Sequence, residues 1–322
     1  TDTVGVARIR SRVLSTNAER LADPVGAAAR DFRVPYENNG RYGQNFPSVH
    51  LWRDLTPNMK ARTSWTTSFG RPSLANALPN FSFNDTNQTV SIGNPALLPQ
   101  QAKNWDFGLE YYFEPVGSVT AGWFHKSIKD YILRGQERSI IGAGADNGYN
   151  GDYVGWSEIS SLNAGTAVAQ GWELSYQQQF TFLPGLLRGL GLVTNVTILD
   201  THGDFGGTAI RRTGEVAGFI PRTGNVIVSW RHRRLSARVR VNYTGDYVTT
   251  YSAASAARSL YVRSRTMVNA SLGFELWPNL SLTCDVANLT NAHQVQYRGI
   301  PDQMALDRNS GTAITFGVAG RF

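Results

Sequence analysis

The residues of this chain that could do chemistry are few, and the densest group lies in segment 146–158. Asp146, Asn150 and Gly151 match part of a calcium-binding loop, which needs oxygen ligands at set positions and a glutamate at its end. Gly148 stands where a ligand is needed, and Ser157 stands where the glutamate is needed. The pattern therefore favours a solvated loop over a calcium site.

Aromatic side chains in the same segment suggest a second kind of chemistry. Tyr149, Tyr153 and Trp156 could stack on a sugar or on an aromatic chelate as a ligand enters. Packing of the loop over the structure beneath it is at least as good an interpretation. Both interpretations also apply to four side chains in other long polar segments, namely Asp204, Phe205, Tyr251 and Tyr297.

Catalytic and cofactor motifs are missing from the sequence. It has no Gly-x-Ser-x-Gly, no His-Glu-x-x-His and no phosphate-binding glycine motif before a helix. The five histidines lack metal-ligand spacing, and the single cysteine, Cys284, can form neither an internal disulfide nor a thiolate metal site. We therefore predict no enzyme, cofactor or metal, while a Ser–His pair distant in sequence, as in barrel lipases, stays open.

Composition favours a folded, turn-rich β protein. The 322 residues are 41% hydrophobic and only 17% charged, which argues against disorder and coiled coils, and 32 glycines accompany an 11% aromatic share. The net charge is +7, but the arginines are spread along the chain rather than clustered, so we do not expect nucleic-acid binding.

Side chains alternate between apolar and polar in several segments. In 59–69 the odd positions carry Met59, Trp65 and Phe69, whereas the even positions carry Lys60 and Arg62. The length, about 9 to 11 residues, is that of a tilted strand that crosses a bilayer, and no run of about 18 apolar residues could form a crossing helix. The same alternation occurs in 105–113, 172–180, 235–243, 268–276, 280–286 and 312–322.

Short and long connections also alternate, which a soluble β-sandwich has no reason to maintain. Short links are expected at 56–58, 114–117, 183–188, 232–234 and 277–279, and long ones at 16–45, 70–102, 135–165, 201–221, 251–260 and 291–310. This parity predicts an all-β fold: an antiparallel transmembrane β-barrel of about twelve strands, starting near 4–13, with short periplasmic turns and long extracellular loops. Aromatic residues near strand ends would form two interfacial girdles: Phe113, Phe180, Phe182, Trp277 and Phe322 near short turns, and Phe69, Trp172 and Tyr247 near long loops.

The alternation also assigns a side to the charged residues. A lipid-facing Arg costs about 2 to 4 kcal/mol at the midplane of a bilayer, so charges that alternate with apolar residues should face the lumen. They would pair with acidic residues of a plug or of neighbouring strands, or alternatively attract an anionic solute. These predicted lumen-facing charges are Lys60, Arg62, Arg231, Arg238 and Arg240.

Several segments together resemble the C-terminal part of the barrel of TonB-dependent outer-membrane receptors. The most recognisable is Asn104-Trp105-Asp106-Phe107-Gly108-Leu109-Glu110-Tyr111-Tyr112-Phe113. Others are Ser68-Phe69-Gly70-Arg71-Pro72, Gly171-Trp172-Glu173-Leu174, Asp285-Val286-Ala287-Asn288-Leu289-Thr290-Asn291 and the terminal Phe322. The ordered series runs through essentially all of residues 1–322.

The resemblance implies a fold and a function. In that family a 22-stranded barrel encloses an N-terminal plug, and this chain is similar to the latter half of the barrel, with plug, TonB-engaging box and earlier strands missing. The implied activity is TonB-dependent uptake of a scarce nutrient, an iron-siderophore, a cobalamin-like molecule or an oligosaccharide, across the outer membrane of a Gram-negative bacterium. The implied partners are TonB, outer-membrane lipids, the nutrient and, through Phe322, the barrel-assembly machinery.

Two other architectures remain as alternatives. A self-closed smaller barrel would act as a passive porin-like channel, and a soluble β-sandwich would act as a binding module. We favour completion of the sheet by further strands, because free sheet edges are costly in hydrocarbon. Residues 1–10 contain no signal-peptide core, so we expect a mature chain or an internal fragment. A sandwich would bury the rows of Leu109 and Val239 between two sheets, whereas a barrel would leave them exposed to lipid.

Overall fold

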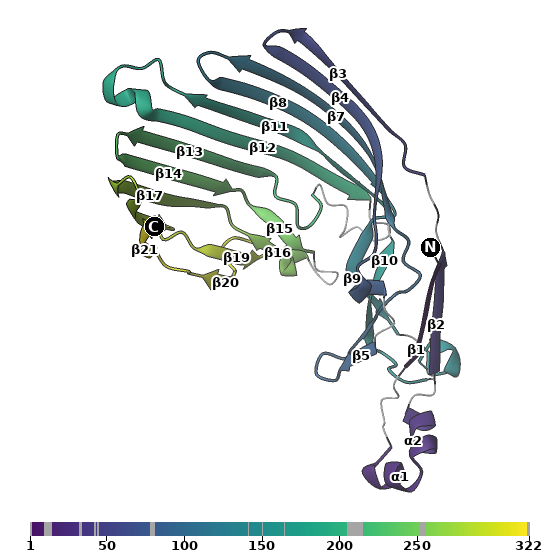
Figure 1. Cartoon of the computed structure of the whole chain (residues 1–322). Helices are drawn as coiled ribbons and strands as arrows, with labels where there is room; N and C mark the ends of the chain where they lie inside the picture. The colour runs from purple at the N-terminus through teal and green to yellow at the C-terminus, as the bar shows by residue number, and fades with distance from the viewer. Residues whose placement is uncertain are drawn as a thin grey trace.

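The computed structural model describes residues 2–9, 15–31, 34–41, 43, 45–77, 81–140, 142–149, 151–163, 165–204, 215–251 and 256–320. Its main feature is an antiparallel sheet of eleven strands that curves like part of a barrel wall (Figure 1). From one edge to the other the strands are β3 (Ser48–Thr56), β4 (Met59–Gly70), β7 (Gln100–Phe113), β8 (Gly117–Lys129), β11 (Thr166–Gln179), β12 (Leu190–Asp204), β13 (Arg222–His232), β14 (Leu235–Thr244), β17 (Arg265–Trp277), β18 (Leu280–Ala287) and β21 (Ala313–Gly320). The spatial order follows the chain, which confirms the up-and-down arrangement.

The alternating segments of the sequence all form strands of this sheet, but several strands run further than predicted. The segment expected at 105–113 is β7, which begins five residues earlier, at Gln100. The added residues, Gln100 to Asn104, carry mostly polar side chains on both faces. The alternating pattern therefore covers only the turn-side part of this strand, 105–113.

The predicted parity of the connections is confirmed. The links between β3 and β4, β7 and β8, β13 and β14, and β17 and β18 are tight turns, and a single 3-10 turn, η2 (Gly185–Gly189), joins β11 to β12. The long connections all leave the opposite end of the sheet, where the loops gather in Figure 1. All described helices are short, and none is long and apolar enough to span a membrane.

The long connections build two further sheets of four strands each. The first has the order β5-β6-β10-β9, and its β6 and β10 pair in parallel although they come from different loops. The second has the order β15-β16-β19-β20. Their elements are α3 (Leu74–Ala77), β5 (Phe81–Asn84), β6 (Thr89–Ile92), β9 (Ile132–Ser139), η1 (Ala145–Asn147), β10 (Ser157–Asn163), β15 (Tyr247–Thr250), η4 (Ala256–Arg258), β16 (Leu260–Val262), β19 (Gln294–Arg298) and β20 (Met304–Arg308).

The strand predicted near residues 4–13 does not belong to the main sheet. Its described part, β1 (Asp2–Ile9), pairs only with β2 (Val34–Arg41), in a separate hairpin at the loop end of the molecule (Figure 1). β2 contains Pro35 and the polar run Glu37-Asn38-Asn39-Gly40-Arg41, and its sequence lacks the apolar–polar alternation of the main-sheet strands. The main sheet therefore has eleven strands, where the sequence suggested about twelve.

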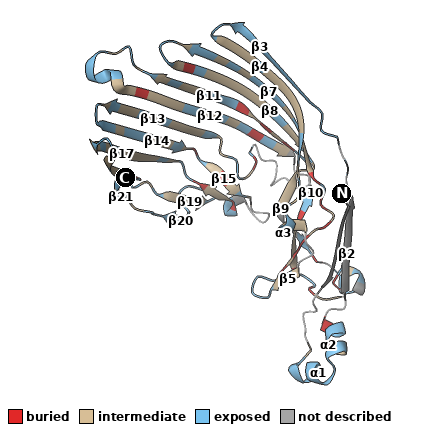
Figure 2. Ribbon diagram, viewed as in Figure 1, coloured by how far each residue is buried: buried red, intermediate tan, exposed pale blue. Residues whose placement is uncertain are grey.

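The faces of the main sheet exclude a sandwich. Leu109 and Val239 are each 42% exposed, the main strands are mostly intermediate or exposed in Figure 2, and most of the buried hydrophobic residues lie in the loop segments instead. Among the described residues, β3 and β21 are the two edges of the sheet and do not pair with each other. The sheet is thus an open, single-layered part of a barrel wall rather than a self-closed barrel.

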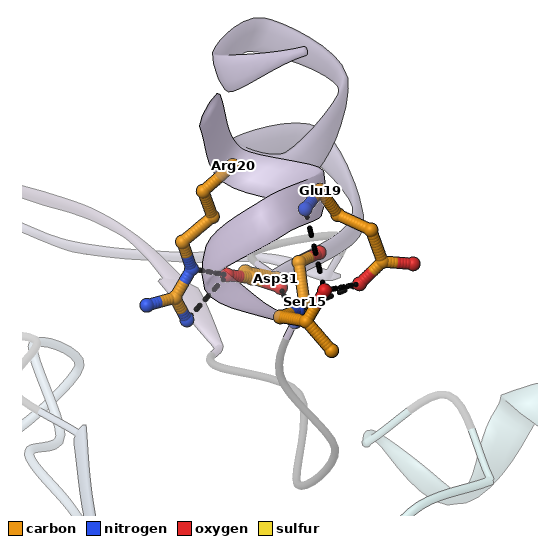
Figure 3. A network of polar contacts seen from close by, with 5 residues as sticks. Ser15, Glu19, Arg20 and Asp31 are labelled. Carbon is orange, nitrogen blue, oxygen red and sulfur yellow. Dashed lines mark hydrogen bonds and ion pairs between the residues drawn. The ribbon is translucent and has the colours of Figure 1, made fainter. Parts of the chain in front are cut away.

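Two short helices at the end of the β1–β2 hairpin form a small, polar-bonded unit (Figure 3). Helix α1 (Asn17–Ala22) begins with a reciprocal capping box between Thr16 and Glu19. At the end of α2 (Pro24–Asp31), the carboxylate of Asp31 accepts a hydrogen bond from the Ser15 backbone N–H at 2.7 Å and one from Arg20 Nη2 at 3.0 Å. Asp31 therefore ties the end of the second helix to the start of the first.

This helical unit should be sensitive to acid. The Ser15 N–H, followed by Arg20, holds the pKa of Asp31 below its ordinary value of 3.8. A lowered pKa stabilises the fold above the unfolded-state pKa, and that stability is lost as the pH falls through the folded-state value. We expect amide hydrogen-exchange protection in residues 15–31 to be constant above about pH 5 and to fall below about pH 4.

Two substitutions distinguish the contribution of the Ser15 hydrogen bond to Asp31 from that of the Arg20 hydrogen bond. Asp31→Asn should lose this protection already at neutral pH, whereas Arg20→Gln should retain part of it because the Ser15 N–H still has its carboxylate. Protection in Asp31→Asn equal to that of the wild type at neutral pH would show that the carboxylate does not hold the unit together.

Candidate functional site

Strand register places the predicted lumen-facing charges on one face of the main sheet. Residues paired across antiparallel strands point to the same side. Lys60 pairs with Asp54 and Glu110, and Arg62 lies two positions along β4. The same relation continues from strand to strand to Arg238 and Arg240 of β14 and to Arg231 of β13. We call this side, which also carries Asp106, Glu173, Glu275 and Asp285, the polar face.

Ion pairs satisfy the charges of β4. Lys60 Nζ lies 3.5 Å from Asp54 Oδ1, and Arg62 Nε lies 3.0 Å from Glu110 Oε1. Glu110 also accepts a hydrogen bond of 2.6 Å from the hydroxyl of Tyr112. Pairing with acids of neighbouring strands, one of the two interpretations of these charges, therefore describes Lys60 and Arg62.

In the part of the chain that the structure describes, the arginines of β13 and β14 lack ion pairs of the kind that Lys60 and Arg62 make on β4. Arg231, Arg238 and Arg240 are exposed, and none makes an ion pair with a residue that the structure describes. The nearest carboxylate in register with Arg238 is Asp285, which lies two strands away beyond Ser271. This part of the polar face therefore carries an uncompensated positive charge.

A hollow of about 560 Å³ interrupts the polar face between β3 and β11. At its floor Gly108 pairs with Gly122 across β7 and β8, and a side chain at Gly108 would meet open space. Its rim carries charged groups and aromatic rings that all lie on the polar face, principally His50, Trp52, Arg62, Asp106, Phe124 and Glu173. The sequence placed Asp106, Gly108 and Glu173 on a polar side but did not bring them together, because that requires the register of four strands.

The aromatic residues of segment 146–158 form the core of the first loop sheet. Tyr149, Tyr153 and Trp156 are at most 3% exposed. Tyr153 lies at the centre, with ring centroids at 5.1 Å from Trp156, 5.7 Å from Tyr149 and 5.9 Å from Phe81. Packing, the alternative to ligand stacking, thus describes where these three rings lie, and contact of these rings with a ligand stays a prediction.

An acid at the edge of this core links it to the surface. Glu158 Oε2 accepts hydrogen bonds from the Tyr149 hydroxyl at 2.5 Å and from Arg138 Nη2 at 2.6 Å. The Glu158 carboxylate raises the pKa of Arg138 above its usual value. Both hydrogen bonds of Glu158 therefore hold the loop in place. No cluster of three or more His, Cys, Asp or Glu side chains suited to a metal occurs among the described residues.

The remaining predicted ligand contacts separate into two groups. Tyr297 stacks on Tyr261 in the second loop sheet, with centroids 5.3 Å apart, and its burial raises the pKa of its hydroxyl. Tyr251 donates a hydrogen bond of 3.0 Å to the carbonyl oxygen of Glu215. Both are half-buried, Tyr297 in β19 of the second loop sheet and Tyr251 directly after β15 of the same sheet. The side chain of Asp204, and the whole of Phe205 and Phe322, lie outside the described residues.

Comparison with known proteins identifies what this arrangement resembles. A model of the family described as TonB dependent receptor-like, beta-barrel matches residues 20–289. No curated protein sequence matches the chain. Among solved structures, a variant of the ferric enterobactin receptor from Pseudomonas aeruginosa superposes with a TM-score of 0.63 at 18% identity, over 89% of this chain and 42% of that one.

Two further structures agree in fold. The siderophore receptor PirA from Acinetobacter baumannii has a TM-score of 0.61 at 14% identity, over 90% of this chain and 43% of that one. The FrpB iron transporter from Neisseria meningitidis has a TM-score of 0.58 at 16% identity, over 90% and 40%. This chain therefore spans less than half the length of the structures that it resembles.

Proposed function

Because the chain belongs to the family of TonB-dependent receptor-like β-barrels, whose barrels are outer-membrane proteins, we propose that it forms the C-terminal part of a receptor barrel for TonB-dependent uptake of a nutrient. Further strands would complete the sheet beyond β3 and β21, and a plug would occupy the polar face. The open edges of the main sheet support this proposal, since unpaired backbone groups cost several kcal/mol each in hydrocarbon.

We propose further that the nutrient is a negatively charged iron chelate. The observation that carries this step is the positive charge of Arg231, Arg238 and Arg240 on the polar face, with no ion pair among the described residues. Lumen charge of one sign raises the local concentration of an oppositely charged solute. The names of the solved structures, which include receptors for ferric enterobactin and for siderophores, favour the same ligand class.

Uptake measurements test both steps. In cells that express the complete receptor, we expect radiolabelled ferric enterobactin to enter only when TonB is present. Arg238→Gln together with Arg240→Gln should slow uptake about tenfold at low ionic strength and less at high salt, because the lost attraction is electrostatic.

Cobalamin and a neutral oligosaccharide serve as controls, since we expect neither to enter through a receptor for a negatively charged chelate. Entry of all three solutes without TonB would indicate a passive channel and contradict the proposal. TonB-dependent entry of only a neutral solute would retain the transporter but overturn the anionic chelate.

A further inference from the structure

The face of the main sheet opposite the polar face, here called the outer face, ends in a row of indole rings toward the loops. Trp65 of β4 pairs with Trp105 of β7, with ring centroids 6.3 Å apart, and Trp123 of β8 pairs with Trp172 of β11. Tryptophan collects where hydrocarbon meets the headgroup layer of a membrane. This row therefore marks the loop-side boundary of the apolar layer.

Basic side chains lie directly beyond the tryptophan row. Lys103 pairs with Ser127, and Lys129 lies two positions further along β8, so the two lysines are diagonal neighbours on the outer face. Both are exposed, and neither makes an ion pair with a described residue. The guanidinium of Arg71 lies 5.4 Å from the ring centroid of Phe69, whose partner Gln101 pairs in turn with Lys129. No carboxylate faces outward on the paired stretches of β4, β7 and β8, so this patch attracts anions.

An apolar hollow of about 780 Å³ lies on the other side of the tryptophan row. Ala61 and Ala121 flank Leu109 in register and leave space at its floor. Phe107, Trp123 and Trp172 form its wall toward the loops. Arg53 also borders the hollow from β3, where it pairs in register with Ala61.

The distance between the lysines and the hollow matches one half of a bilayer. From Lys103 to Leu109 the strand rises about 20 Å, at about 3.3 Å per residue. A strand tilted by about 45° converts this length to about 14 Å of height, close to half of a hydrocarbon core that is about 30 Å thick. A lipid with its phosphate at the lysines would therefore place the end of an acyl chain in the hollow.

We propose that the outer face of β4, β7 and β8 binds one phosphorylated lipid of the loop-side leaflet. The phosphate contacts Lys103 and Lys129, the acyl chain lies against Trp105 and Phe107, and its end fills the hollow between Ala61 and Ala121. The proposal requires the outer face to contact lipid, as in the receptor barrel proposed above, but does not depend on which nutrient is carried.

Native mass spectrometry of the complete receptor in detergent tests this site with three probes. Dimyristoyl phosphatidate has both phosphate and chains, dimyristoylglycerol has only the chains, and inorganic phosphate has only the anion. We expect one bound phosphatidate per receptor, with weaker binding of dimyristoylglycerol and no displacement by millimolar phosphate. Equal affinity for dimyristoylglycerol, or displacement by inorganic phosphate, would overturn the proposal.

Matched variants locate the site. Lys103→Gln and Lys129→Gln should each weaken phosphatidate binding about fivefold, the contribution of one basic side chain at an anionic lipid surface. Lys126→Gln on the polar face of the same strand should leave it unchanged. Ala121→Phe should fill the hollow and weaken binding, whereas Ala237→Phe, on the outer face of β14, should not.

The outcome can be distinguished from that of the proposed transport. Lipid affinity is compared only between preparations of each variant that heat-modifiability shows to be folded barrel. Where a variant does not fold, binding of the three probes to the wild-type receptor still tests the site. Unchanged affinity in the two lysine variants would overturn the lipid site whatever the uptake assay gives. A loss of TonB-dependent uptake with lipid binding intact would instead contradict only the transport proposal.

Discussion

Val239→Arg is expected to abolish assembly of the barrel in the membrane. Val239 lies halfway along β14, on the outer face, between Val228 of β13 and Ala270 of β17. An arginine on a lipid-facing strand costs about 2 to 4 kcal/mol at the bilayer midplane. The position is too far from either end of the strand for the guanidinium to reach headgroups easily. Heat-modifiability of the protein in isolated outer membranes should therefore show little or no folded barrel.

The neighbouring residue provides the control. Arg238 lies on the polar face between Ser229 and Ser271 and makes no ion pair with a described residue. Arg238→Ala removes a charge from a wet surface, so folded barrel should accumulate as in the wild type. Normal assembly of Val239→Arg combined with failure of Arg238→Ala would mean that the two faces are assigned the wrong way round.

This pair of neighbours also illustrates what the sequence could predict. Alternation of apolar and polar residues is imposed by lipid on one face and water on the other, so it is visible in a single strand without its partners. The strand of Val239 and the turn after His232 were predicted correctly for that reason, and the register places Arg238 on the face opposite Val239, while its exposure to a lumen stays a prediction. Alternation is lost beyond the apolar layer, which is why the loop-side end of β7 was not predicted.

Pairings between distant segments could not be predicted in the same way. The parallel pairing of β6 with β10 joins two different loops, and the alternation of Val90 and Ile92 with polar residues covers only four residues and does not identify the partner strand. The segment 146–158 was recognised as aromatic, but only the arrangement around Tyr153 shows that its rings pack together. The hollow above Gly108 likewise depends on the register of β7 and β8.

Replacement of a single glycine should disrupt the sheet almost as severely as a charge in lipid. Gly171 of β11 lies between Phe124 of β8 and Leu199 of β12. A Cβ atom at this position would lie 2.1 Å from the carbonyl oxygen of Ile198, a distance that forces the backbone of β12 to move. Because β12 also pairs with β13, its displacement would leave backbone groups of two ladders unpaired, at a cost of several kcal/mol in hydrocarbon.

We therefore expect Gly171→Ala to lower both the yield of folded barrel and its thermal unfolding temperature. Gly108→Ala is the matched control, since Gly108 lies on the same polar face and a Cβ atom there meets nothing within 4 Å. The two variants add the same methyl group to the same sheet, so a difference between them measures the close approach of β11 and β12 rather than the loss of a glycine. Equal yields and unfolding temperatures for both would show that β12 adapts to the added atom, and that close packing at Gly171 does not determine the register of the wall.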